Sequence, residues 1–171
     1  MSRLGIFQII SFFVYLFLQV LLLRNVVLFH TAFCFVYIAY LFLFPVDSNP
    51  LLLMGLGFLL GFTVDVFYES LGMHAFACVL IMYVRNYWLN LITPQGGYDP
   101  HVIPSMAMSG PRWLMVYMMP LIFLHHALLF YIEAGGFGLF WFTLWKIIAS
   151  TFFTMLVIMI IQFLFPQRRR L

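Results

Sequence analysis

Ionisable side chains are few in this sequence, and several lie inside apolar stretches where their presence needs an explanation. Charged residues make up only 8% of the 171 residues. An ionisable group in an apolar environment is costly unless it has a partner, so each is a candidate for an ion pair, a metal ligand or a contact between helices. The candidates within or beside the apolar stretches are Asp65, His74, Arg85, His125, His126, Glu133 and Lys146.

One of these residues, Asp65, continues a stripe of small residues. Gly57, Gly61, Asp65 and Glu69 follow one another at spacings of four, so on a helix they share one face. Glycines at this spacing let a second helix approach closely. We therefore expect a buried contact face that sets the packing of two helices. The residues assigned to this packing and partner surface are Gly57, Gly61, Asp65, Leu71, Gly72 and His74.

Depth along the helices decides which cation could neutralise Asp65. At about 1.5 Å of rise per residue, Arg85 lies roughly 20 Å from the helix end near Leu71, which is too deep for a direct contact. Lys146 and His74 lie at compatible depths, so they rank first as partners. In the alternative, Asp65 is hydrated at the membrane boundary and Lys146 extends its amino group to the same boundary.

Neither a metal site nor an enzyme active site is predicted. His125 and His126 are adjacent, so on a helix they point about 100° apart, unlike the i, i+4 pair that shares a metal ion. We expect them to form hydrogen bonds with a neighbouring helix or with a carboxylate. Ser70, Ser109 and Ser150 lack the sequence context of an activated nucleophile. The sequence thus predicts no catalysis and no cofactor.

The composition predicts an all-α, polytopic integral membrane protein. Hydrophobic residues make up 65% of the chain and aromatic residues 20%, whereas an average soluble domain has about 25% charged residues. Apolar runs of about 20 residues recur, and each is long enough to cross the hydrocarbon layer as a helix. We expect a single domain without internal repeats. Its six expected transmembrane helices cover residues 4–23, 26–44, 50–67, 71–91, 113–132 and 137–165.

The connections between these spans predict the orientation. The one long connection, residues 92–112, is too rich in proline and glycine for a helix. Six spans place both termini on one side, and the basic residues near the span ends favour the cytoplasm for that side. Because these residues sit at span ends rather than along one face, they predict contact with membrane lipids and not with nucleic acid.

Residues 51–75 resemble the rod shape-determining protein MreD family. The family pattern is a helix with G-x-x-x-G-x-x-x-D, a short turn and then L-G-x-H/N-A. Here the helix carries Gly57, Gly61 and Asp65, and residues 71–75 read L-G-M-H-A. Size, minimal loops and a basic C-terminus extend the resemblance over essentially the whole chain. Further agreement lies in Gln19, Arg85, Leu124, His125, His126 and Glu133.

The resemblance implies a non-catalytic scaffold and regulator of the bacterial elongasome, which directs rod cell shape and lateral peptidoglycan synthesis. Members of the family lie in the inner membrane and bind the single-span periplasmic protein MreC. Through MreC they contact RodA and its partner transpeptidase, with MreB filaments on the cytoplasmic side. The resemblance also allows a homo-oligomer within the complex.

A rival hypothesis comes from the fold that the resemblance implies. The MreD fold resembles the substrate-binding subunits of energy-coupling-factor vitamin transporters, in which polar residues line a pocket for a small solute. Such a pocket needs several convergent polar groups and a cover, yet the expected outer loops at residues 24–25, 69–70 and 133–136 are short. The sequence therefore favours the scaffold over the solute-binding subunit.

Overall fold

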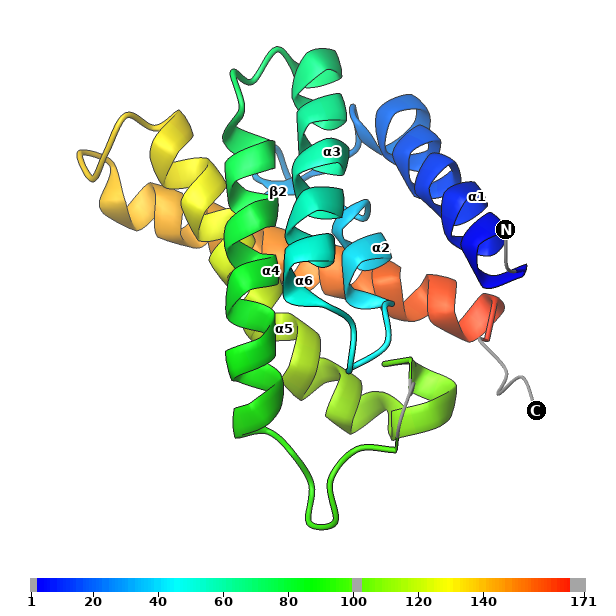
Figure 1. Ribbon diagram of the computed structural model, residues 1–171. Helices are drawn as coiled ribbons and strands as arrows, with labels where there is room; N and C mark the ends of the chain where they lie inside the picture. The colour runs from blue at the N-terminus through cyan, green and yellow to red at the C-terminus, as the bar shows by residue number, and fades with distance from the viewer. Residues whose placement is uncertain (1–2, 100–102, 167–171) are drawn as a thin grey trace.

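Helices make up most of the chain in the computed structural model, which describes residues 3–99 and 103–166. Figure 1 shows the helices gathered around residues 34–42, a central segment that is only partly helical. Within the described residues the elements, in chain order, are α1 (Arg3–Phe17), its π-helical continuation η1 (Leu18–Leu23), β1 (Val27–Leu28), β2 (Ala32–Phe33), α2 (Ile38–Phe42), α3 (Pro50–Tyr68), α4 (Met73–Leu91), α5 (Met106–Glu133) and α6 (Phe140–Leu164).

Membrane-spanning length and composition are found in four helical stretches of the described chain. They are Ile6–Leu23, Pro50–Tyr68, Ser109–Glu133 and Phe140–Leu164. α4 also has 19 residues, but it carries Arg85, Asn86 and Asn90 and is less apolar. The chain is thus a mostly helical protein with four helices suited to a membrane, where six spans were expected.

The expected helix over residues 26–44 is not formed. Val27 and Leu28 pair antiparallel with Phe33 and Ala32 in a two-stranded hairpin, and the short helix α2 follows only at Ile38. Continuous hydropathy does not distinguish a helix from an irregular segment that is buried in protein. Non-helical backbone is tolerated at membrane depth when neighbouring side chains satisfy its polar groups, and such side chains are present here, as described below.

The start of α3 follows the local capping rules. The side chain of Asn49 accepts a hydrogen bond of 2.9 Å from the backbone N–H of Leu51, and Pro50 occupies the first helical position, where its missing N–H is harmless. The helix ends at Tyr68, because Glu69 adopts the left-handed conformation with φ of 57°. The third expected span, residues 50–67, therefore differs from α3 by one residue.

The connection after α4 is shorter than expected, because α5 already begins at Met106. The backbone N–H of Met106 donates to Oε1 of Gln162 on α6 at 2.7 Å, which fixes this helix start. A kink follows at Gly110, whose φ of 79° and ψ of 159° are not helical. The last part of the expected loop, residues 106–112, therefore belongs to α5, which is kinked at Gly110.

A second proline in α5 is compensated by a side chain of α4. Pro120 has no backbone N–H, so it leaves the carbonyl of Val116 without its usual helical donor. Nε1 of Trp88 donates to this carbonyl at 3.2 Å and to the carbonyl of Tyr117 at 3.1 Å. The indole thereby satisfies the helix at its proline and ties α4 to α5.

Packing places residues 34–42 in the middle of the molecule. α3 lies along α4, α5 packs against α4 and α6, and β2 lies on α6. Every residue from Cys34 to Phe42 is at most 5% exposed. α1 stands at the edge of the bundle in Figure 1, and most of its large apolar side chains are exposed. The central segment is therefore the part of the chain that the surrounding helices hold.

Candidate functional site

Gly57 and Gly61 of α3 form a close contact with α4. A Cβ atom added at Gly61 would lie 2.6 Å from the carbonyl oxygen of His74 and 2.6 Å from Cα of Ala75. At Gly57 it would lie 3.2 Å from the carbonyl oxygen of Cys78. Both contacts are with helix backbone, which cannot move aside as a flexible side chain can. The two glycines thus let α3 and α4 approach to a separation that no larger residue allows.

Asp65 caps the N-terminus of α4 across this contact. Its Oδ1 accepts from the backbone N–H of His74 at 3.0 Å and from the hydroxyl of Ser70, and its Oδ2 accepts from the N–H of Ala75 at 2.9 Å. The residue in the N-cap position, Gly72, has no side chain that could do this. A carboxylate is favoured at a helix N-terminus, where free N–H groups converge. Asp65 is 5% exposed, and it caps α4 although it belongs to the neighbouring helix α3.

The cation expected beside Asp65 lies elsewhere. Lys146 pairs with Glu133, with 2.8 Å between Nζ and Oε2, so the expected pairing of Asp65 with Lys146 is wrong. The predicted contact with His74 exists, but it is made by the backbone N–H and not by the imidazole. The N–H groups at the N-terminus of α4 converge on Asp65. They stabilise its negative charge in place of the expected counter-ion.

The turn between α3 and α4 leaves one large apolar side chain without cover from the described chain. Leu71 is fully exposed, and its φ of 51° is unusual for a residue with a side chain. Gly72 follows with φ of 89°. Of the residues assigned to the packing and partner surface, Leu71 therefore faces outward, whereas Gly61, Asp65 and His74 are buried.

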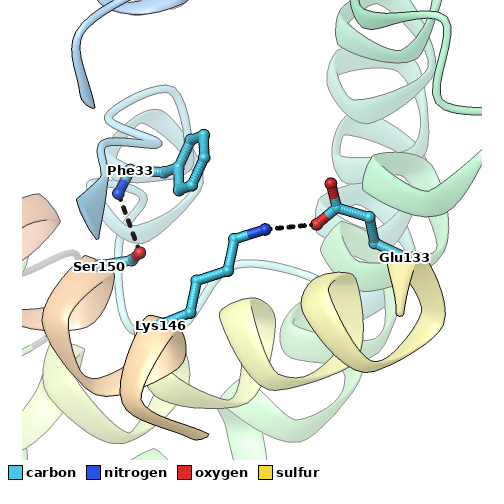
Figure 2. A network of polar contacts seen from close by, with 4 residues as sticks. All are labelled: Phe33, Glu133, Lys146 and Ser150. Carbon is cyan, nitrogen blue, oxygen red and sulfur yellow. Dashed lines mark hydrogen bonds and ion pairs between the residues drawn. The ribbon is translucent and has the colours of Figure 1, made fainter. Parts of the chain in front are cut away.

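Lys146 and Glu133 hold the ends of α5 and α6 against β2. Figure 2 shows the amino group of Lys146 extending toward Glu133 past the ring of Phe33. The same amino group lies 4.7 Å from the ring centre of Phe33 and 4.1 Å from that of Phe130. The lysine side chain is 17% exposed and the glutamate 51%. This arrangement combines an ion pair at the surface with two cation–π contacts.

Two hydroxyl groups of α6 satisfy the extended backbone after β1. The N–H of Phe33 donates to Oγ of Ser150 at 2.9 Å, and the N–H of Phe35 donates to Oγ1 of Thr154 at 3.1 Å. Alternate residues of an extended segment present their groups on the same side. Residues four apart on a helix also share a side. Ser150 and Thr154 are thus spaced to meet the N–H groups of Phe33 and Phe35. We call these two hydroxyl groups the template on α6.

Gln19 satisfies the same segment from the side of α1. Its Nε2 donates to the carbonyl of Cys34 at 3.0 Å and to the hydroxyl of Tyr68 at 2.8 Å, and its Oε1 accepts from the N–H of Tyr37 at 3.4 Å. The amide is fully buried and lies in η1. π-helical turns are rare, and many of them lie at functional sites. Here the turn carries the amide that joins α1 to the central segment.

Tyr37 joins two histidines at the centre of the molecule. Its hydroxyl lies 2.8 Å from Nδ1 of His74 and 2.8 Å from Nε2 of His125. A hydroxyl has one proton, so it donates to one imidazole and accepts from the other. Nδ1 of His125 has no partner among the described residues, and an unpaired acceptor is tolerated better than an unpaired N–H. We therefore assign a proton to Nε2 of His125, which donates to Tyr37, and Tyr37 donates to His74.

His126 supports the template on α6 rather than a metal site. Its Nδ1 lies 2.7 Å from the carbonyl of Ile122, so Nδ1 carries the proton, and its Nε2 lies 3.2 Å from Oγ1 of Thr154. The hydroxyl of Thr154 thus has two acceptors, this imidazole nitrogen and, at 3.4 Å, the carbonyl oxygen of Phe33. Among the described residues no group of three or more His, Cys, Asp or Glu side chains is arranged to hold a metal ion.

The ring of Phe35 fills the space between the three histidines. Its centre lies 5.2 Å from the ring centre of His74, 5.3 Å from that of His126 and 6.1 Å from that of His125. Its side chain is 4% exposed. The polar groups that the sequence left as candidates for a pocket therefore surround a side chain of the chain itself.

Arg85 holds the other end of the central segment. Its Nε donates to the hydroxyl of Tyr117 at 2.6 Å, and its Nη2 donates to the carbonyls of Phe44 at 2.7 Å and Pro45 at 3.2 Å. Tyr117 in turn donates to the carbonyl of Phe42. The guanidinium is fully buried, and its Nη1 has no partner among the described residues. Arg85 thus supplies N–H donors to two carbonyls that follow α2, and Tyr117 supplies a donor to the last residue of α2.

Several residues of this network were not assigned a role from the sequence. Ser150 was considered only as a nucleophile, and Gln19 only as part of a family resemblance. A usable signal was present, because Ser150 and Thr154 are hydroxyl residues at a spacing of four in an apolar helix. The acceptor role of these hydroxyls could not be foreseen, since residues 26–44 were expected to satisfy their own backbone. The unassigned residues are Gln19, Phe35, Tyr37, Tyr117, Ser150 and Thr154.

Comparisons with known proteins identified no relative of this chain. No family model, no curated protein and no solved structure matches the chain.

Proposed function

We propose that this chain is a non-catalytic membrane scaffold of the MreD type that binds MreC and regulates lateral peptidoglycan synthesis. In this proposal it is a multi-pass protein of the bacterial inner membrane with both termini in the cytoplasm. RodA, its partner transpeptidase and MreB are reached indirectly through the complex. The motif in residues 51–75 is the basis of the family assignment.

The observation that carries the scaffold role is that the polar core is used to hold the chain itself. Ser150 and Thr154 bind the backbone of residues 33 and 35, and Gln19 binds that of residues 34 and 37. Asp65 caps a helix of the same chain. Buried side chains whose hydrogen bonds are all made within the chain stabilise one arrangement of its helices. A scaffold needs such a fixed arrangement in order to present a constant surface to its partners.

The central position of Phe35 favours the scaffold over the solute-binding subunit of a transporter. A small-molecule site needs a concave space with a few convergent polar groups. Here the histidines converge on the ring of Phe35, so a solute would have to displace a buried segment that is hydrogen-bonded on two sides. This displacement makes the vitamin-transporter hypothesis the weaker of the two.

The outer turns supply surface for a partner. Leu71 is fully exposed between α3 and α4, and Phe29 is 90% exposed in the turn between β1 and β2. Both have positive φ values near 51°. Residues with side chains that adopt positive φ are conformationally constrained, and we take these two exposed side chains as the candidate contact points. We place the contact with MreC at the outer half of the molecule, where the packing of α3 on α4 orients Leu71.

Purification of the tagged chain from native membranes in mild detergent, followed by mass spectrometry of the bound proteins, tests this function. Recovery of MreC supports the scaffold. Recovery of an ATPase pair with a membrane coupling subunit, in place of MreC, would contradict the scaffold and establish the transporter.

A further inference from the structure

Two hydrogen bonds of Tyr37 form a chain of polar groups that starts at His74 and ends at His125. His74 lies in the first turn of α4 and is 2% exposed, and its Nε2 is not among the fully buried atoms that lack a partner. His125 is fully buried, and its Nδ1 has no partner among residues 3–99 and 103–166. The chain therefore meets the molecular surface at His74 and is closed at His125.

The single hydroxyl proton of Tyr37 fixes the direction of this chain. In the neutral form His125 donates from Nε2 to Tyr37, and Tyr37 donates to Nδ1 of His74. A proton added to His74 gives its Nδ1 an N–H, which donates to Tyr37, so the hydroxyl must turn to Nε2 of His125. His125 then carries its own proton on Nδ1, where the described chain offers no acceptor. Proton uptake at His74 thus leaves a buried N–H of His125 unpaired.

The charges around the two imidazoles favour a cation at His74 rather than at His125. The carboxylate of Asp65 on α3 accepts a hydrogen bond of 3.0 Å from the backbone N–H of His74, so a cation on His74 has a negative neighbour. His125 has instead a second imidazole beside it, that of His126, with 5.4 Å between the ring centres. The other polar or charged groups near the chain or beside its neighbours are Gln19, Arg24, Tyr68, Cys78 and Thr154.

None of these groups supplies an acceptor to Nδ1 of His125 in the described chain. The sulfur of Cys78 lies 3.8 Å from the hydroxyl of Tyr37, but sulfur is a weak acceptor and does not replace an imidazole nitrogen. The ring of Phe35 packs against His125 with 6.1 Å between ring centres and against His74 with 5.2 Å. Withdrawal of this ring, with the backbone of residues 33–37 that carries it, opens the space beside His125 to water.

We propose that His74, Tyr37 and His125 form a proton-sensitive switch that holds residues 33–37 in place. Proton uptake at His74 reverses the two hydrogen bonds, and the unpaired N–H of His125 favours a form in which Phe35 withdraws and residues 33–37 are released. The closed form requires neutral imidazoles, so the switch is closed at alkaline pH and opens as the pH falls below about 6.5, where histidine normally takes up a proton. This inference goes beyond the proposed function and needs no partner protein.

Nitrogen NMR of the full chain in detergent micelles, with isotope-labelled histidine, tests the direction of the chain. The chemical shift of an imidazole nitrogen shows whether that nitrogen carries a proton. At about pH 8 we expect protons on Nε2 of His74 and Nε2 of His125, and at about pH 5 on both nitrogens of His74 and on Nδ1 of His125. The same protonation of His125 at both pH values would overturn the switch.

Hydrogen–deuterium exchange with mass spectrometry tests the release of residues 33–37. After correction for the intrinsic rate, their exchange should rise about tenfold from about pH 8 to pH 5, the usual effect of leaving a buried N–H unpaired. His74→Asn keeps an amide oxygen that can accept from Tyr37 but cannot take up a proton, so residues 33–37 should stay protected at both pH values. His30→Asn is the matched control at an exposed histidine and should respond like the wild type. Equal responses of His74→Asn and the wild type, or no response of the wild type, would overturn the switch.

Glu133 and Lys146 are the ionisable pair beside Phe33, so their part in an acid response needs a separate control (Figure 2). Carboxylates normally titrate below about pH 4.5, and Glu133→Gln should therefore leave the response unchanged. Loss of the response in Glu133→Gln would make this pair the sensor and the switch wrong. Tyr37→Phe removes the hydroxyl that joins the imidazoles, so protonation of His74 should no longer move the proton of His125 in the NMR spectrum. A proton that still moves in Tyr37→Phe would contradict the role of Tyr37.

Discussion

Asp65 illustrates how a buried carboxylate is stabilised without a cation. Its two oxygens accept hydrogen bonds from the N–H groups of His74 and Ala75 and from the hydroxyl of Ser70. A counter-ion would neutralise its charge, but the free N–H groups of a helix start supply both direction and partial positive charge. Lys146 is thereby left to bind Glu133 at the ends of α5 and α6.

Replacement of Asp65 by alanine should destabilise the protein by about 1–3 kcal/mol, because two buried N–H groups at the start of α4 lose their acceptor. The exposed carboxylate of Glu69, four residues later, provides the control. Glu69→Gln should change stability by less than about 0.5 kcal/mol. Denaturant unfolding in detergent measures both. Equal effects of the two substitutions would show that Asp65 is not a structural cap.

At the scale of the elements, the contact between α3 and α4 depends on the position of each glycine. A methyl group at Gly61 would collide with backbone at 2.6 Å, at Gly57 it would meet backbone at 3.2 Å, and at Gly55 it would meet nothing within 4 Å. Gly61→Ala should therefore cost about 1–3 kcal/mol or more, and Gly57→Ala should cost less. Gly55→Ala should be neutral or stabilising by up to about 1 kcal/mol, because alanine favours a helix.

Unfolding midpoints of these three alanine variants test the order, and recovery of MreC with each variant tests the consequence for the proposed complex. Gly61→Ala should lower MreC recovery most, since it separates the helices that orient Leu71. A loss of stability in Gly55→Ala that equals the loss in Gly61→Ala would contradict an origin in the close helix contact.

The template on α6 predicts a difference between two neighbouring threonines. Thr154 accepts from the N–H of Phe35 and contacts His126, whereas Thr151 donates only to the carbonyl of Ile147 in its own helix. Thr154→Val should destabilise the protein by about 1–3 kcal/mol and should increase the hydrogen exchange of residues 33–37, because a buried N–H loses its acceptor. Thr151→Val should leave this exchange unchanged. Increased exchange in both variants would assign the effect to α6 as a whole.

Local signals in the sequence specify α3 well and the central segment poorly. Asn49 and Pro50 mark a helix start by their own chemistry, and the spacing of Gly57 and Gly61 indicates which face another helix can approach. Residues 26–44 read as a span because their composition is apolar apart from His30, Thr31 and the tyrosines. Their backbone partners lie at Gln19 on one side and at Ser150 and Thr154, more than 100 residues later, on the other. No local pattern encodes an acceptor so distant in sequence.

The same limit applies to the candidate site. The sequence identified Asp65, Arg85 and the histidines as buried polar groups that need partners. It could not predict that backbone groups would serve as partners for Asp65 and Arg85, since any residue provides them. Charge and depth alone therefore assigned Lys146 to the wrong carboxylate.

At the scale of the whole molecule, α1 is an outer helix that is tied to a well-packed body through one buried amide. Gln19 makes every side-chain hydrogen bond found for α1 and η1 in the described part of the chain, and it binds both the central segment and Tyr68 of α3. The remaining contacts of α1 with the body are few and mostly apolar. The amide of Gln19 is therefore the polar link that couples α1 to the central segment.

Gln19→Leu should release both parts at once, because the carbonyl of Cys34 and the N–H of Tyr37 lose their partner while α1 loses its polar tie. Hydrogen–deuterium exchange with mass spectrometry should show faster exchange in residues 6–23 and in residues 33–37, with unchanged exchange in the pair α3 and α4. Gln8→Leu, on the same face of α1 but without a hydrogen bond, is the matched control and should change neither region in the isolated chain. Faster exchange in α1 alone would mean that Gln19 anchors the helix but does not hold the segment, and it would separate the two roles assigned to this amide.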